Sequence, residues 1–220
     1  AALSFSYVIL LIQRVLHDVG MVMGDVNWMN TRRMLSMLEP YPKQYRGSGA
    51  TLPESWVRQT APRHGLTPWT LFGALYGTRG LVAAGRSEIK KRLRPLAERM
   101  VFLNPRTTSW LNRMVSRLKF LRGTRHARTL DRLDASLQIL TGRPSDIALP
   151  LAYYKTGKDP LRERGLDPAR DGSGLLWYAP LVPMRGERVK VFVELVETVC
   201  ARHGMEPLIT LTSHGAGCWL

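Results

Sequence analysis

A nearly unbroken apolar run covers residues 175–182, between a polar loop rich in proline and glycine and Pro183. A continuous run of this length, with aromatic and branched side chains, predicts a buried central strand. Trp177 and Tyr178 are adjacent, so a strand would point them to opposite faces. One of them is then expected to pack against helices while the other lines a cavity or an interface.

The first sixty residues show helical spacing of apolar positions, interrupted by turn residues. Val8, Leu11, Ile12, Val15 and Leu16 share one helical face, which predicts a helix over residues 4–18 that closes at Gly20. The following stretch predicts, in order, a short strand over 21–26, a helix capped by Asn27 or Asn30 and ended before Pro40, a loop over 39–52 and a short helix from Pro53.

Two similar stretches, 63–68 (RHGLTP) and 202–207 (RHGMEP), each combine a cationic helix end, a glycine and a proline. This order is typical of a helix that ends just before a strand. We expect one strand–helix–strand unit across 69–103, with strands at 69–76 and 100–103 around a helix from Thr78 to about Leu93. A second unit is expected across 174–213.

Two such units, joined by extra helices, predict an α+β fold of ferredoxin-like split βαβ repeats, with an antiparallel sheet covered by helices on one face. Residues 69–77 and 175–183 should both be central strands of that sheet. The stretch 106–141 is expected to be helical with a break near Gly123, and Ser145 to start a short helix that reaches Tyr154.

Composition allows one large domain, because the chain has 220 residues and 45% of them are hydrophobic. Two cysteines indicate no disulfide framework, which favours a cytoplasmic protein over a periplasmic one. The apolar start at 4–12 is too short to cross a bilayer and has no basic leader, so we expect no membrane span. A first residue other than Met indicates a processed product or a fragment.

The formal net charge of +15 would allow binding to nucleic acid, to an anionic membrane or to an acidic partner. The basic residues are mostly arginines scattered along the chain. We therefore favour a compositional bias with an acidic partner domain over a nucleic-acid footprint. The basic amphipathic stretch 113–132 is likewise better explained as a solvated helix face than as a membrane-binding surface.

No catalytic motif stands out. Cys200, His203, His214 and Cys218 have ligand types that suit zinc. The first two are expected at a helix end, where the helix dipole alone favours a cation, so we predict no metal site. No glycine-rich phosphate loop and no Ser-His-Asp order is visible, so the chain should not hold a nucleotide by itself.

Several motifs together resemble the C-terminal cap domain of FAD-linked oxidases, in the vanillyl-alcohol oxidase and para-cresol methylhydroxylase group of flavoproteins. They are residues 174–180 (GLLWYAP), 72–77 (FGALYG) and 208–212 (LITLT), with Asp25-Val26 and Arg32-Arg33 nearer the start. The resemblance covers roughly residues 1–220. It implies that the FAD-binding domain and a C-terminal tail lie outside this chain.

The resemblance implies a substrate-covering domain of an FAD-dependent oxidoreductase, which moves a hydride from the benzylic carbon of a para-substituted phenol to the flavin. The FAD-binding domain would be supplied in cis or in trans, a cytochrome is a candidate electron acceptor, and a homo-oligomer is compatible with the group. The alternative function is a basic module that binds RNA or anionic membrane, in which the arginines would cluster on one exposed face.

The resemblance also assigns cofactor-binding and pocket positions. Some members attach FAD through a histidine where this chain has Leu175, so that attachment is not expected here. Cresol-type members use an upstream tyrosine, for which Tyr154 and its neighbour Tyr153 are candidates, although core packing is the favoured alternative. Trp177 matches an aromatic pocket residue and Thr210 a position that faces the flavin, with ordinary strand packing as the alternative.

Overall fold

The computed structural model describes residues 5–20, 23–47, 49–117, 137, 146, 148–156, 165–214 and 218–219. The chain divides into two compact units, of which the larger combines Ala1–Arg99 with Leu151–Leu220 and the smaller is Met100–Pro150. No described helix is both long and apolar enough to cross a bilayer.

The larger unit is built on an antiparallel sheet with the strand order β2-β1-β4-β5-β3. β1 (Met23–Asn30) pairs with β2 (Trp69–Leu75) on one side and with β4 (Thr210–His214) on the other. The short strands β5 (Cys218–Trp219) and β3 (Val182–Pro183) extend the sheet beyond β4. The predicted α+β class with an antiparallel sheet is confirmed.

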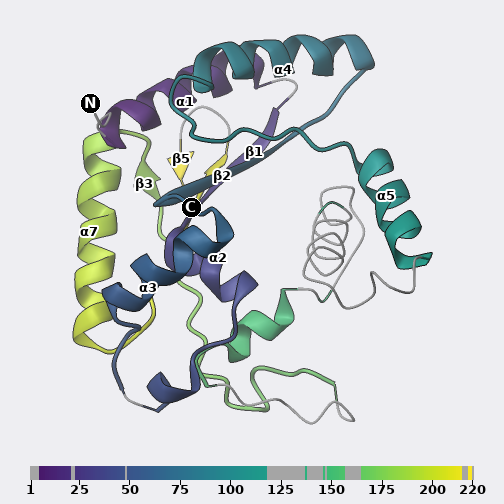
Figure 1. Cartoon of the computed structure of the whole chain (residues 1–220). Coiled ribbons are helices and arrows are strands. Elements are labelled where there is room, and N and C mark those ends of the chain that lie inside the picture. The colour runs from purple at the N-terminus through teal and green to yellow at the C-terminus, as the bar shows by residue number, and fades with distance from the viewer. Residues whose placement is uncertain are drawn as a thin grey trace. The chain divides into compact units, whose positions relative to one another are not determined.

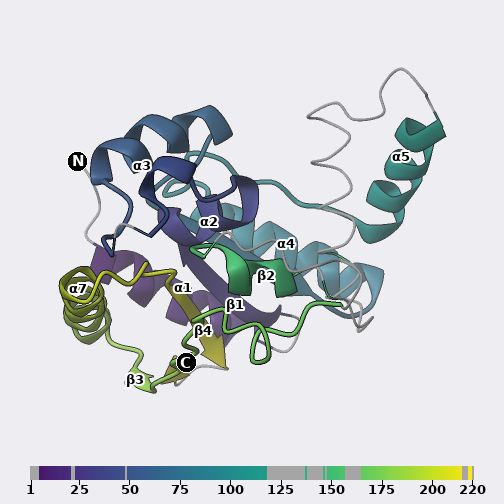
Figure 2. The same cartoon turned by 90° about the horizontal axis from the view of Figure 1, so that it is seen from below.

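Three helices cover one face of this sheet. They are α1 (Phe5–Val19), α4 (Arg79–Leu93) and α7 (Gly186–Arg202), and α1 contacts both of the others. Figures 1 and 2 show α1 and α4 along the same face of the sheet. The buried stripe of α1 follows the helical period, at Ile9, Ile12, Val15 and Leu16. Alternate residues of β1 and β4 are buried as well, namely Val26, Trp28, Leu211 and Ser213.

Short helices gather at the end of the sheet where β1 finishes. They are α2 (Thr31–Leu38), η1 (Lys43–Tyr45), α3 (Glu54–Thr60) and η2 (Ala61–His64), with Tyr154 after η4 (Leu149–Tyr153). Their buried side chains form one cluster, which we call the loop core: Leu35, Tyr41, Leu52, Val57 and Tyr154. This second core holds the long 39–52 loop onto the domain.

Capping residues begin the helices where the sequence indicates. The Asn30 side chain accepts a hydrogen bond from the Arg33 amide, and Thr78 accepts one from the Leu81 amide. The two similar stretches also end their helices alike, because Gly65 and Gly204 both have left-handed backbone, with φ of 62° and 61°. They end different helices, however, since η2 is a short 3-10 turn and α7 is a 17-residue α-helix.

In the smaller unit the described helix is α5 (Pro105–Arg117). It confirms the beginning of the helical stretch expected over 106–141, while Gly123 and Ser145 lie outside the described residues. The strand expected at 100–103 is wrong, because these residues have no regular secondary structure. Val101 and Leu103 are exposed, so this apolar stretch is not buried as a strand of the sheet would be.

The central strand expected at 175–183 is also wrong. Within this range only Val182 and Pro183 form a strand, at an edge of the sheet. Residues 69–77 do contain a strand, β2, but it lies at the opposite edge, so the central position expected for it is wrong too. Residues 175–181 are extended coil whose large side chains are exposed, and the Trp177 side chain is 82% exposed. Pro180 lacks a backbone N–H and Gly174 turns the chain with a φ of 73°, so neither supports a continuous ladder.

Candidate functional site

The face of the sheet that α1 and α4 do not cover brings together side chains from its three longest strands. Paired residues of an antiparallel sheet point to the same face. Asn27 pairs with Phe72 and Thr212, and Met29 pairs with Thr70 and Thr210. We call these six residues the open sheet face: Asn27, Met29, Thr70, Phe72, Thr210 and Thr212.

The open sheet face is neutral, half-buried and partly polar. Phe72 is 40% exposed and the other five side chains are intermediate in exposure. Thr212 Oγ1 donates to Asn27 Oδ1 at 2.7 Å, which links β4 and β1 across this face. None of the six side chains is charged, although the chain carries a net charge of +15. Such a surface suits a flat, uncharged ring.

Thr210 lies on this face and is the first residue of β4. Trp177 and Leu175 lie in a different environment. They belong to the exposed apolar segment, which we define as residues 175–181 and which includes Leu175, Leu176, Trp177, Tyr178 and Leu181 as exposed side chains. Contiguous exposed apolar side chains of this kind mark interaction surfaces.

Tyr154 is placed in the loop core. Its ring meets that of Tyr41 edge to face, with the centroids 5.1 Å apart, and it is only 8% exposed. Burial raises the pKa of its hydroxyl, and that hydroxyl has no hydrogen-bond partner among the described residues. The neutral, buried phenol is therefore held as a packing residue, in line with the favoured alternative for this position.

Tyr153 supports the loop that precedes the exposed apolar segment. Its hydroxyl donates to Asp171 Oδ2 at 2.7 Å, and the Arg170 guanidinium donates to the same carboxylate at 2.8 Å. Hydrogen bonds from Arg170 and Tyr153 lower the pKa of Asp171 to about 2. The ionised Asp171 thus anchors the 165–174 loop to η4.

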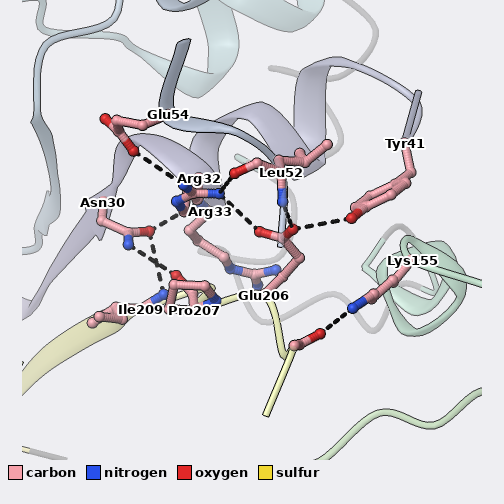
Figure 3. A network of polar contacts seen from close by, with 11 residues as sticks. Asn30, Arg32, Arg33, Tyr41, Leu52, Glu54, Lys155, Glu206, Pro207 and Ile209 are labelled. Carbon is pink, nitrogen blue, oxygen red and sulfur yellow. Dashed lines mark hydrogen bonds and ion pairs between the residues drawn. The ribbon is translucent and has the colours of Figure 1, made fainter. Parts of the chain in front are cut away.

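A buried ion pair fixes the start of β4 (Figure 3). Arg32 Nη1 donates to Glu206 Oε2 at 3.0 Å, and the Tyr41 hydroxyl donates to Glu206 Oε1 at 3.0 Å. The Leu52 amide donates to the same Oε1 atom, and Arg32 also pairs with Glu54 at 3.0 Å. The Glu206 side chain is 4% exposed. The sequence motifs contained Arg32 and Glu206 but gave no sign that they pair.

Asn30 completes this anchor from the end of β1. Its Nδ2 donates to the Pro207 carbonyl at 2.9 Å, and its Oδ1 accepts from the amides of Arg33 and Ile209 at 2.9 and 3.2 Å. All of these bonds lie within three residues of Thr210 or at the start of α2. The network therefore sets the register in which β4 presents Thr210 and Thr212.

The structure offers no support for a metal centre. No group of three or more potential ligands gathers among the described residues. Cys200 lies in the last turn of α7 and His203 follows that helix, where burial raises the pKa of the Cys200 thiol. The side chains of His214 and Cys218 are outside what the structure describes, so the four-residue arrangement itself is not tested.

Comparison with known proteins agrees with the fold. No family model matches the chain. It is 26% identical over 193 residues to 1'-carboxy-chondrochloren decarboxylase of Chondromyces crocatus, a match that covers 87% of this chain and 35% of that protein. Among solved structures it is similar to p-cresol methylhydroxylase with substrate bound, with a TM-score of 0.64 and 16% identity over 96% of this chain.

The resemblance indicated by the sequence motifs is thereby confirmed: the chain is similar to the para-cresol methylhydroxylase group in fold. It spans 35% of the length of each of these two proteins. Activities that belong to the whole of such a protein therefore need parts that this chain does not contain.

Proposed function

We propose that this chain is the substrate-covering cap domain of an FAD-dependent oxidoreductase that acts on para-substituted phenols. The observation that carries the proposal is the open sheet face, a neutral surface on a fold that matches p-cresol methylhydroxylase over 96% of the chain. In this role the face closes over the flavin ring and the substrate and excludes water from them. Neither comparison favours the alternative of an RNA- or membrane-binding module.

The residues of this chain fit the ring of FAD better than its phosphates. A pyrophosphate group needs several convergent backbone N–H groups, usually where a glycine-rich loop opens a helix. Gly47 and Gly49 have positive φ but lie inside the 39–52 loop and open no helix, and Pro53, which has no N–H, stands at the start of α3. We infer that the phosphates are held by the part of the protein outside this chain.

FAD, when bound, supplies the acceptor for a hydride from the benzylic carbon of the phenol. The residues of this chain would bind and orient the flavin ring and the substrate, and would enclose both. Thr210 and its row neighbour Met29 would contact the flavin ring, and Trp177 would line the substrate pocket. Leu175 would make an apolar contact where some members carry the histidine that attaches FAD. Tyr154 would reach the cofactor only after leaving the loop core, so the proposal rests on Thr210 and Trp177.

The proposal is tested by a chimera in which this chain replaces the matched third of p-cresol methylhydroxylase. We expect the purified chimera to retain FAD, and its visible spectrum to bleach under anaerobic conditions when a para-substituted phenol is added. The 220-residue chain alone should bind no FAD at micromolar concentration, because one wall of a site cannot offset the cost of immobilising the cofactor.

A matched pair of variants separates function from folding. Trp177→Ala and Trp110→Ala each remove an exposed tryptophan, one in the exposed apolar segment and the other on α5. Only Trp177→Ala should lower phenol-dependent bleaching. A yellow protein from the isolated chain, or a flavin-loaded chimera that no phenol bleaches, would contradict the proposal.

A further inference from the structure

Phe72, Asn27 and Thr212 form one row across β2, β1 and β4. Asn27 is the Cα partner of Phe72 on one side and of Thr212 on the other, so the three side chains are direct neighbours on the open sheet face. The row combines an aromatic ring that is 40% exposed, an amide and a hydroxyl. It contains both a flat apolar contact and polar groups at fixed spacing.

The hydrogen bond within the row fixes the direction of the amide. Thr212 Oγ1 donates to Asn27 Oδ1 at 2.7 Å, which occupies the acceptor end of the side chain. The donor end, Nδ2, has no hydrogen bond recorded to any described residue and lies on a half-exposed face. An amide whose acceptor is held in this way presents two N–H groups to whatever covers the sheet.

Asn30, three residues along the same strand, shows what a purely structural amide looks like in this fold. It is 6% exposed on the opposite face, and both ends of its side chain are used, through Pro207, Arg33 and Ile209. Asn27 uses only its acceptor. The difference indicates that the Asn27 donor is available for a ligand rather than required by the fold.

We propose that the Phe72–Asn27–Thr212 row is a binding site for a planar aromatic ring, with Asn27 Nδ2 donating to an oxygen on that ring. This inference rests on the proposed function and names the residues that would recognise the ligand. Phe72 supplies an aromatic contact and Asn27 supplies the hydrogen-bond donors. Two sources present this chemistry, namely the oxygen of a phenol and a ring carbonyl of a flavin.

The absence of charge in the row predicts its selectivity. A chain of net charge +15 attracts carboxylates without any specific site. The row itself has no cation, so a neutral phenol should bind there at least as well as an aromatic carboxylate. Benzoate is therefore the control ligand for nonspecific attraction.

The test follows the side-chain amide signals of Asn27 by NMR in the full 220-residue chain, labelled with 15N. The probes are 4-methylphenol, lumiflavin and benzoate, each added up to its solubility limit. We expect the Asn27 amide signals to shift with 4-methylphenol, with lumiflavin or with both, and a smaller effect of benzoate. The probe that shifts them more identifies the source of the ring.

Two substitutions and a control sharpen this result. Asn27→Leu removes the Asn27 side-chain signals, so binding in all variants is compared through the backbone amides of Phe72 and Thr212, its partners in the row. Asn27→Leu should weaken binding of the effective probe about three- to tenfold, as expected for one lost hydrogen bond. Thr212→Val should weaken it less, because the amide loses its fixed direction but keeps its donors. Thr198→Val removes an exposed hydroxyl on α7 and should change nothing.

The proposed binding site is overturned if neither 4-methylphenol nor lumiflavin shifts the Asn27 amide signals. It is also overturned if Asn27→Leu binds both probes as well as the unaltered chain does. These outcomes are distinct from failure of the cap proposal. A chimera that retains FAD and is bleached by phenols, with or without Asn27→Leu, would keep the proposed function and reject this site.

Discussion

The chain buries a charged network at Glu206 and exposes its aromatic side chains at Trp177. The Glu206 carboxylate is 4% exposed, while Trp177 is 82% exposed. Most globular proteins distribute these residue types the other way round. One rule explains both regions: a side chain tolerates an unusual environment when partners compensate for it. Donors from three places in this chain satisfy Glu206, whereas the exposed apolar segment has no cover among the described residues and, under the proposed function, is the surface that a partner domain would bury.

A large loss of stability should come from neutralising the buried charge. Glu206→Gln leaves Arg32, whose side chain is 15% exposed, without its buried counter-charge. We expect a loss of about 3 kcal/mol of unfolding free energy, measured by urea denaturation. Glu54→Gln removes the other partner of Arg32, which is 57% exposed, and should cost less than about 1 kcal/mol. Equal losses in the two variants would show that the Glu206 network is no stronger than a surface pair.

Two tryptophans, one buried and one exposed, test how much the exposed apolar segment contributes to stability. Trp28 is 3% exposed beneath the helices, so Trp28→Ala should cost about 3–5 kcal/mol of unfolding free energy. Trp177→Ala should change the unfolding free energy by less than about 0.5 kcal/mol, because nothing in the isolated chain is lost from its packing. Denaturation curves of both variants check this, and a large loss for Trp177→Ala would mean that the segment is packed in solution.

Two tyrosines of the loop core differ in one hydrogen bond. Tyr41→Phe removes a donor to the buried Glu206 carboxylate and should cost about 1.5–3 kcal/mol of unfolding free energy. Tyr154→Phe removes a buried hydroxyl that has no partner among the described residues and should stabilise the chain by about 1 kcal/mol. If Tyr154→Phe is instead destabilising, that hydroxyl has a partner in solution.

The smallest expected effect is a loss of folding stability at acidic pH, through Asp171. The folded-state pKa of Asp171 is lowered from 3.8 to about 2 by Arg170 and Tyr153. A lowered pKa contributes stability at pH values above 3.8, and that contribution is lost as the pH falls toward 2. NMR titration of the Asp171 carboxyl carbon should give the low pKa directly. Tyr153→Phe should raise it, while Tyr45→Phe should leave it unchanged.

Local patterns were sufficient for most helices and for the existence of β1 and β2, but not for the order of the strands, because β2 is an edge strand and not a central one. Asn30 and Thr78 cap helices as their positions suggest, and the apolar spacing of α1 matches its buried stripe. Capping and helical periodicity depend on residues within one or two turns, so a single sequence contains the information.

The same patterns could not say what covers an apolar run. Residues 175–182 have the composition of a buried strand, and the composition would be the same for a surface that another domain buries. The Arg32–Glu206 pair joins residues 174 positions apart, and the Asn27–Thr212 bond spans 185. No local signal connects residues at such distances, so the site depends on a strand register that only the structure supplies.

The pairing of β1 with β4 also governs when the domain can fold during synthesis. Val26 and Ser213, which bond to each other in the centre of the sheet, are 187 residues apart in sequence. Contacts of such long range raise the contact order and slow folding, because the chain between them must be gathered first. On the ribosome β1 can pair with β2 early, but its other edge stays open until residues 210–214 have emerged. The nascent chain therefore carries an unpaired strand edge while residues 31–209 are synthesised, and chaperones and aggregation compete for it during that interval.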